Sequence, residues 1–270
     1  MTVGPPLRYF EGYLPIEDHG LIGDGSTAAL AGRDGTIWWM CIPRFDSRPL
    51  FDSIIDARRG SQFAITPHRP IEARQAYLPD TGVLVTEIQS QSGLVSITDA
   101  LGLQTGADLA QGAEAARHEL IRSIVVLAGD IDLNIAFRFP EGTRIDKTAE
   151  GFQIQPSSHT GLSVCLSTSL PLDSLHTRVH LSSGERMSFA LSWSGSPDKN
   201  VEEVLHDTVK AWRRWIQEFR YAGPQEPIVR RSAITLKLLN DFANGAIIAA
   251  PTSSLPESIG GRRNWDYRYS

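Results

Sequence analysis

The amino-acid sequence predicts a mainly β protein, in which an antiparallel β-sandwich is followed by helices. Three observations support this prediction. Short runs of apolar and β-branched residues, separated by Gly, Pro, Ser and Asp, fill the chain from about residue 60 to 193, as is usual for strands joined by turns. No helical pattern lies between these runs, which favours antiparallel strands over a parallel α/β sheet. After residues 194–197 the apolar residues recur at three- and four-residue steps, which is the period of a helix.

The strand signal is clearest in six runs. They lie at residues 83–90, 94–99, 120–127, 131–139, 162–168 and 186–193. Gly129 and Asp130 separate the third run from the fourth, and these residue types supply the backbone conformations of tight turns. We therefore predict a hairpin at this point.

Two helices are predicted after residue 197. Asp198 or Asn200 can cap the first helix, whose apolar stripe continues for about five turns and which ends near Pro224. The second helix begins near Pro227 and ends near residues 244–245. The apolar positions are Val201, Val204, Leu205, Val209, Trp212, Trp215, Ile216 and Phe219 in the first helix, and Ile228, Ala233, Ile234, Leu238, Leu239 and Phe242 in the second. Because two helices cannot cover each other's apolar stripes, we predict that they begin a third unit that this chain does not complete.

The composition excludes several classes of protein. The 270 residues carry 26 Lys and Arg against 31 Asp and Glu, a formal charge of −5, so the surface does not attract nucleic acid or an anionic membrane. Cys41 and Cys165 each lie in an apolar run, so we expect neither a disulfide framework nor a zinc site. No stretch of about 18 apolar residues and no leader pattern occurs. We expect a cytoplasmic protein without a cofactor or a metal.

Residues 23–28 (Gly-Asp-Gly-Ser-Thr-Ala) match the dinucleotide-binding pattern by letter. That pattern needs a strand before it and a full helix after it, so that the helix amino terminus binds the pyrophosphate. Only Leu21 and Ile22 precede the motif, and Gly32 and Gly35 would interrupt a helix after it. We therefore predict a plain Gly-rich turn.

Glu17, Asp18, His19 and Asp24 form a compact group whose side chains are of the types that ligate metals or perform acid/base chemistry. The group lacks the i, i+4 spacing of ligands on a helix, and the sequence indicates no distant partner for it. A hydrogen-bonded surface loop is the favoured interpretation.

Other chemistry-bearing residues have structural interpretations. Trp212 and Trp215 lie on the apolar stripe of the first helix, which makes them core anchors rather than rings for stacking on a ligand. The adjacent Glu202 and Glu203 face different sides of that helix and cannot form a paired-carboxylate site. The sequence has no G-x-S-x-G motif, so a serine hydrolase of the α/β type has no support.

The carboxy-terminal stretch combines flat aromatic rings with charged groups. Its residues are Asn264, Trp265, Asp266, Tyr267, Arg268 and Tyr269. A carbohydrate site uses such groups, because rings stack on the apolar face of a sugar while charged groups bind its hydroxyls. A structured interface loop would have a similar composition, so both interpretations stay open on composition alone.

Three segments resemble the amino-terminal half of bacterial glycoside hydrolase family 15 proteins, the glucoamylase and trehalase-like enzymes. They are PIEDHGLIGDGSTAALAGRDGTI, CIPRFDS, and VRRSAITLKLL followed by GAIIAAPTSSLPESIGGRRNWDYRY, within Pro15 to Ser270. The resemblance implies an amino-terminal, supersandwich-like β-sandwich, a helical linker and an α/α barrel of six helix pairs. It therefore implies a sandwich domain at 1–196, a linker at 197–223 and a first, incomplete portion of the barrel at 224–270.

The resemblance also implies roles for residues of the carboxy-terminal stretch. The family's D-Y-x-Y-x-W-x-R-D signature matches Asp266, Tyr267 and Tyr269 before the sequence ends. Tyr267 is thereby implied as a contact of the non-reducing glucose, with Trp265, Asp266 and Arg268 shaping the same loop. The family's two catalytic glutamates lie further along the barrel, so no catalytic residue is assigned in this chain. Trp38 departs from the family, whose members usually have an acidic residue there.

The chemistry implied by the resemblance is inverting hydrolysis of an α-glucosidic bond in an α-glucoside or oligosaccharide substrate. In such enzymes a carboxylic acid protonates the leaving oxygen while a carboxylate activates water on the opposite face of the sugar. The competing hypothesis is a non-catalytic carbohydrate-binding or assembly module, and a structural remnant of a truncated gene is a third. The sequence leaves open whether the chain forms a homo-oligomer.

Overall fold

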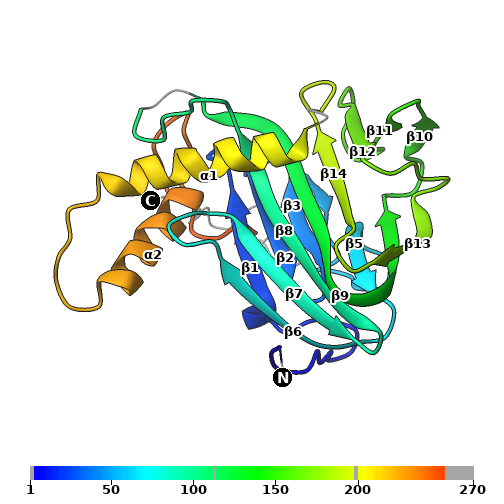
Figure 1. The fold of residues 1–270 in the computed structure, drawn as a ribbon. Coiled ribbons are helices and arrows are strands. Elements are labelled where there is room, and N and C mark those ends of the chain that lie inside the picture. The colour runs from blue at the N-terminus through cyan, green and yellow to red at the C-terminus, as the bar shows by residue number, and fades with distance from the viewer. Residues whose placement is uncertain (1–2, 112–113, 198–199, 253–270) are drawn as a thin grey trace.

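A computed structural model describes residues 3–111, 114–197 and 200–252 of the chain. This part contains fourteen antiparallel strands, which are linked by hydrogen bonds into one large folded sheet (Figure 1). The strands are β1 (His19–Gly23), β2 (Ala28–Gly32), β3 (Thr36–Cys41), β4 (Pro49–Phe51), β5 (Gln62–Pro67), β6 (Pro70–Tyr77), β7 (Leu84–Ser90), β8 (Gly93–Leu103), β9 (Ala116–Arg138), β10 (Arg144–Lys147), β11 (Gly151–Gln155), β12 (Val164–Thr168), β13 (His176–Ser182) and β14 (Arg186–Ser192). The predicted mainly β, antiparallel class is confirmed.

The long strand β9 belongs to two layers of this sheet. Its first half pairs with β8 and β14, within a layer that runs β6-β7-β8-β9-β14-β12-β11-β10. Its second half pairs with β5 and β13, within a layer that contains β1, β2, β3 and β4. The two layers pack face to face, since Phe63 of β5 lies edge-on to Phe189 of β14 with ring centroids 5.4 Å apart. One apolar core fills the space between them.

The hairpin predicted at Gly129 and Asp130 is wrong, because residues 116–138 form one continuous strand. Gly129 has a φ of 77° and pairs with Gly93, and a side chain there would collide with the carbonyl oxygen of Ser92. A shift in register follows Leu94 on the neighbouring strand, and such irregularities bend a strand without reversing it. The turn-forming residues therefore redirect β9 from one layer to the other.

The strands before residue 60 gave no clear signal in the sequence. All six residues of β3 are buried, so β3 does not show the alternation of buried and exposed positions that identifies a half-buried strand. Both β1 and β2 consist largely of Gly, Ala and Leu, and these residues have no strong strand preference.

An ion pair between Arg122 of β9 and Asp99 of β8 lies inside the sandwich. Both side chains are essentially unexposed, and Nε of Arg122 is 2.7 Å from Oδ1 of Asp99. The same guanidinium donates hydrogen bonds to the carbonyl oxygens of Phe63 (3.1 Å) and Gly35 (2.8 Å) in the opposite layer, and it stacks 4.6 Å from the centre of the Phe63 ring. Arg122 therefore joins the two layers through the core.

Helix α1 (Val201–Gln217) lies across the outer face of the layer that contains β8 and β14 (Figure 1). Its first turn is capped by Asn200, whose side chain accepts a hydrogen bond from the backbone N–H of Glu203, as one of the two sequence alternatives predicted. Val201 and Val204 pack in an apolar cluster with outward-facing strand residues such as Ile121. The stripe predicted from the helical period is the face that packs on the sheet.

The two tryptophans of α1 are core residues, as predicted. Trp212 is buried and Trp215 packs edge-on against it, with ring centroids 6.0 Å apart. They belong to an apolar cluster with Ile234 and Leu238 of helix α2 (Glu226–Leu238). The tryptophans therefore hold the second helix to the first.

Helix α2 ends at Leu238, earlier than the predicted end near residue 244. The side chain of Asp241 accepts a hydrogen bond from the N–H of Ala243, and the N–H of Phe242 donates to the carbonyl oxygen of Gly25. These bonds fold the chain into a turn against the β1–β2 connection, which competes with continued helix. None of the described helices is long and apolar enough to cross a membrane.

Replacing Arg122 with Met should destabilise the fold by about 3–5 kcal/mol, because Asp99 would keep a buried charge without its partner. The matched control is Arg74→Met, which breaks the exposed pair with Glu87 and should cost less than about 1 kcal/mol. Urea denaturation of both variants measures the two free energies of unfolding. Equal losses in the two variants would show that the buried pair has no special role.

Candidate functional site

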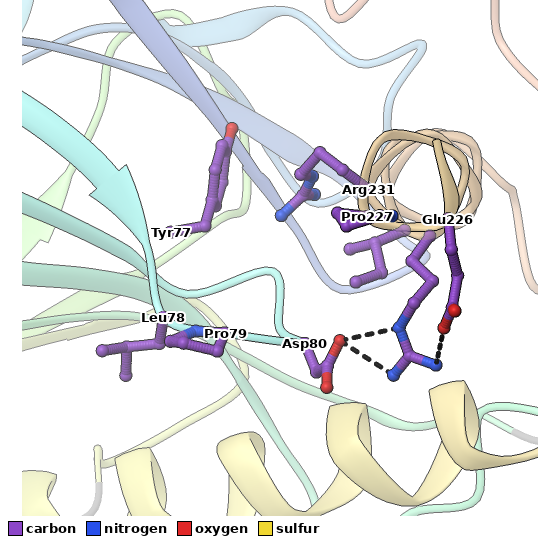
Figure 2. Close-up of a pocket in the computed structure, with 9 residues that line it drawn as sticks. Tyr77, Leu78, Pro79, Asp80, Glu226, Pro227 and Arg231 are labelled. Carbon is purple, nitrogen blue, oxygen red and sulfur yellow. Dashed lines mark hydrogen bonds and ion pairs between the residues drawn. The ribbon is translucent and has the colours of Figure 1, made fainter. Parts of the chain in front are cut away.

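A cavity of about 470 Å³ lies between the end of β6, the loop that follows it, and helix α2. Figure 2 shows Tyr77, Leu78 and Asp80 on the strand side and Glu226 and Arg231 on the helix side. The loop and the helix meet here because the apolar face of α2 packs near residue 82, where a side chain would collide with Leu238 and Trp212. Gly82 therefore permits the close approach that forms the cavity.

Arg230 lies between two carboxylates at this cavity. Its Nη2 and Nε atoms are 2.9 Å and 3.1 Å from Oδ1 of Asp80, and its Nη1 atom is 3.8 Å from Oε1 of Glu226 (Figure 2). The pair with Asp80 joins residues 150 positions apart in the sequence. Carboxylate acceptors and a guanidinium donor are thus presented side by side.

Arg231 supports the wall of the cavity next to Tyr77. Its guanidinium stacks 3.9 Å from the centre of the Tyr77 ring, and its Nη1 atom donates to the carbonyl oxygen of Thr81 over 2.8 Å. The Tyr77 hydroxyl donates to the carbonyl oxygen of Leu21 and accepts from the N–H of the same residue, both at 2.9 Å. Burial raises the pKa of the Tyr77 phenol and lowers the pKa of Arg231. These contacts fix the ring in place.

Two backbone positions beside the cavity adopt the left-handed conformation, which is uncommon for residues other than Gly. They are Asp80, with a φ of 64°, and Gln225, with a φ of 63°. Such conformations cost free energy and often occur at functional sites. This cavity was not predicted from the sequence; the Pro79-Asp80-Thr81-Gly82 turn and the Arg230-Arg231 pair are the sequence features that mark it.

The site residues predicted from the sequence, Trp265, Asp266, Tyr267 and Arg268, lie outside the residues that the structure describes. The described chain approaches its end beside β3, where Nε1 of Trp39 donates to the carbonyl oxygen of Pro251 over 2.8 Å. Ile248 packs with Phe45 in the same region.

The group of Glu17, Asp18, His19 and Asp24 is not one cluster. Asp18 forms an ion pair with Arg33 at 2.6 Å, and Nδ1 of His19 is 2.9 Å from the carbonyl oxygen of Pro15. Asp24 lies at the other end of β1, in the turn to β2. Asp18 and His19 are hydrogen-bonded, as the favoured interpretation expected, but Asp24 is buried rather than part of a surface loop. In the described ranges, no three or more His, Cys, Asp and Glu side chains gather as a metal site would require.

Residues 23–28 connect the antiparallel strands β1 and β2, so the prediction of a plain turn is confirmed. In this turn Oδ1 of Asp24 accepts hydrogen bonds from the N–H groups of Ser26 (2.8 Å) and Thr27 (2.9 Å). Trp38 is buried and donates from Nε1 to Oδ1 of Asp34 over 3.2 Å.

Asp24 is buried, and burial raises its pKa to about 6. The folded state therefore holds a proton that the unfolded state, with an ordinary pKa of 3.8, releases. Stability should consequently fall as the pH rises from about 4 to about 6, by about 3 kcal/mol from this group. Asp24→Asn should remove that fall and be the more stable protein at pH 7. Urea denaturation across this pH range measures the difference.

The control for Asp24→Asn is Asp146→Asn, which changes an exposed carboxylate on β10. Its stability should follow the wild-type pH profile. If the profile of Asp24→Asn also ran parallel to the wild type, Asp24 would not be the group that titrates.

Comparisons with a family model and with known proteins both match trehalase-like proteins. The family described as "Trehalase-like, N-terminal" matches residues 9–165, which is more than half of the chain. A protein named Trehalase from Mycolicibacterium smegmatis is 31% identical over 100% of this chain and 46% of its own length. Proteins of the same name from Thermoplasma volcanium and Mycobacterium tuberculosis are 34% and 29% identical over 96% and 100% of this chain, and over 43% and 44% of their own lengths. The chain spans less than half the length of these curated relatives.

Proposed function

Because the chain belongs to the trehalase-like N-terminal family, we propose that it is the amino-terminal part of an α-glucoside hydrolase that releases glucose from trehalose or a related α-linked substrate. The observation that carries this proposal is the family match over residues 9–165, together with relatives named Trehalase that are more than twice as long as the aligned region. The sequence resemblance also covers glucoamylases. It therefore adds maltose or a dextrin as alternative proposed substrates.

The proposal assigns helix α1 to a linker and helix α2 to the start of a catalytic domain. It divides the chain into a sandwich at 1–196, a linker at 197–223 and the first portion of an α/α barrel at 224–270. The exposure of Ile228 (63%) and Leu236 (52%) on α2 supports this division, since large apolar side chains on a helix are expected to be covered when the domain is complete.

The proposed chemistry needs an acid and a base that the sequence resemblance places outside this chain. Inverting hydrolysis uses an acid and a base carboxylate about 6.5–9.5 Å apart, and we propose that both lie in the part of the longer protein that follows Ser270. Tyr267 is the proposed contact of the non-reducing glucose, with Trp265, Asp266 and Arg268 around it. A cytoplasmic location stays a prediction.

The competing proposal is a carbohydrate-binding or assembly module that works without a catalytic domain. It shares the aromatic stretch at 264–269 but requires neither acid nor base. The two proposals differ in one measurable property, because only the first requires a longer protein for glucose release.

Residues 1–270 alone should release no glucose from trehalose, maltose or maltotriose, whereas the longer protein should hydrolyse at least one of them. A coupled glucose assay with a buffer blank measures both. In the longer protein, Tyr267→Ala should lower kcat/KM by at least about tenfold, the effect of losing about 1.4 kcal/mol of transition-state binding. Glucose release by residues 1–270 above the blank would contradict the assignment of the acid and base.

Residues 1–270 alone should bind a hydrophobic dye, because the outer face of α2 carries uncovered apolar side chains. Replacing Ile228 and Leu236 together with Ser should reduce the dye fluorescence. Leu127→Ser is the matched control, since Leu127 is 45% exposed on β9, far in the sequence from α2. An equal reduction in the control would show that the dye does not report on α2.

A further inference from the structure

We propose that the cavity between β6 and α2 is a binding site for a neutral sugar of one or two rings. The geometry of the cavity carries the proposal, and only the choice of glucose-containing ligands rests on the proposed function. The site would bind the sugar without cleaving it.

The charges at the cavity favour a neutral ligand over an ion. Asp80 and Glu226 carry two negative charges, and Arg230 and Arg231 carry two positive charges, so the formal charge of the lining sums to zero. A neutral lining gives no net attraction to a phosphate or a metal ion. Sugar hydroxyls both donate and accept hydrogen bonds, and the cavity offers acceptors and donors next to each other.

Asp80 is placed to accept from a ligand. Both of its contacts with Arg230 end on Oδ1, and the Asp80 side chain is 43% exposed. Oδ2 is therefore left for a hydroxyl donor, while Arg230 holds the carboxylate in one orientation. Hydrogen bonds to a charged acceptor are stronger than neutral ones.

The remaining walls suit the C–H face of a sugar ring. Leu78, Pro79, Pro227 and Ile234 supply apolar surface around the charged groups. A volume of about 470 Å³ lies within the range of about 300–1,000 Å³ typical of small-molecule sites. Such sites combine apolar walls with a few polar groups that fix the orientation of the ligand.

The site is held ready for a ligand by its surroundings. Asp80 has a left-handed backbone conformation, and the stacking of Arg231 on Tyr77 together with its bond to Thr81 fixes the loop against α2. A preformed site loses little conformational freedom on binding. A sugar in the cavity would contact both the loop and the helix.

The test is titration of residues 1–270 with trehalose, maltose and lactose by calorimetry, together with hydrogen exchange in the presence of each sugar. We expect saturable binding of at least one sugar and slower exchange at residues 77–81 and 226–234. Asp80→Ala and Arg230→Met should each weaken binding at least about tenfold. Arg230→Met changes no residue of the loop itself, and circular dichroism verifies that both variants fold.

Asp146→Ala is the matched control, because it breaks an exposed ion pair with Arg144 on β10; it should leave the affinity unchanged. The absence of saturable binding, or an affinity unchanged by both cavity variants, would overturn the proposal. Hydrolysis by the longer protein is assayed separately. If the longer protein shows no hydrolysis but sugar binding still depends on Asp80, the proposed function is wrong and the sugar site is supported. If hydrolysis occurs but sugar binding does not depend on Asp80, only the proposed sugar site is wrong.

Discussion

The buried ion pair between Arg122 and Asp99 connects the two layers of the sandwich through the core. Removing two charges from water costs several kcal/mol for each ion, and the cost is offset only when the remaining hydrogen-bonding groups are also satisfied. The carbonyl oxygens of Phe63 and Gly35 provide these partners from the opposite layer. One side chain therefore connects the two layers of the sandwich through satisfied hydrogen bonds.

The position of Arg122 also determines what the outer face of the sheet presents. Because side chains alternate along a strand, the neighbours Ile121 and Ser123 point outward. Ile121 packs in the cluster beneath α1, and the hydroxyl of Ser123 donates to Glu202 at 2.5 Å. The tryptophans of α1 then hold α2, which meets the loop after β6 and encloses the cavity. The candidate site is thus a consequence of packing that begins in the core.

Patterns among neighbouring residues predicted the elements that depend mainly on residues close in the sequence. Strands β7, β8 and β14 and the core tryptophans follow from periodicity and side-chain chemistry, and Asn200 is one of the two caps that the sequence offered. The course of β9 could not be predicted in this way. Gly129 permits either a turn or a bend, and the choice depends on partner strands that are distant in the sequence. The cavity could not be predicted from neighbouring residues either, because the pair of Asp80 and Arg230 joins residues 150 positions apart. The Gly-rich turn at 23–28 was predicted correctly because no helix could follow it.

The proposed function requires that this chain is the amino-terminal part of a longer hydrolase. The intact mass of the natural protein, isolated with an antibody to the sandwich and sequenced by top-down mass spectrometry, tests this requirement. We expect a species much heavier than 29.7 kDa whose sequence continues past Ser270. A natural protein that ends at Ser270 would contradict the claim and favour a binding or assembly module.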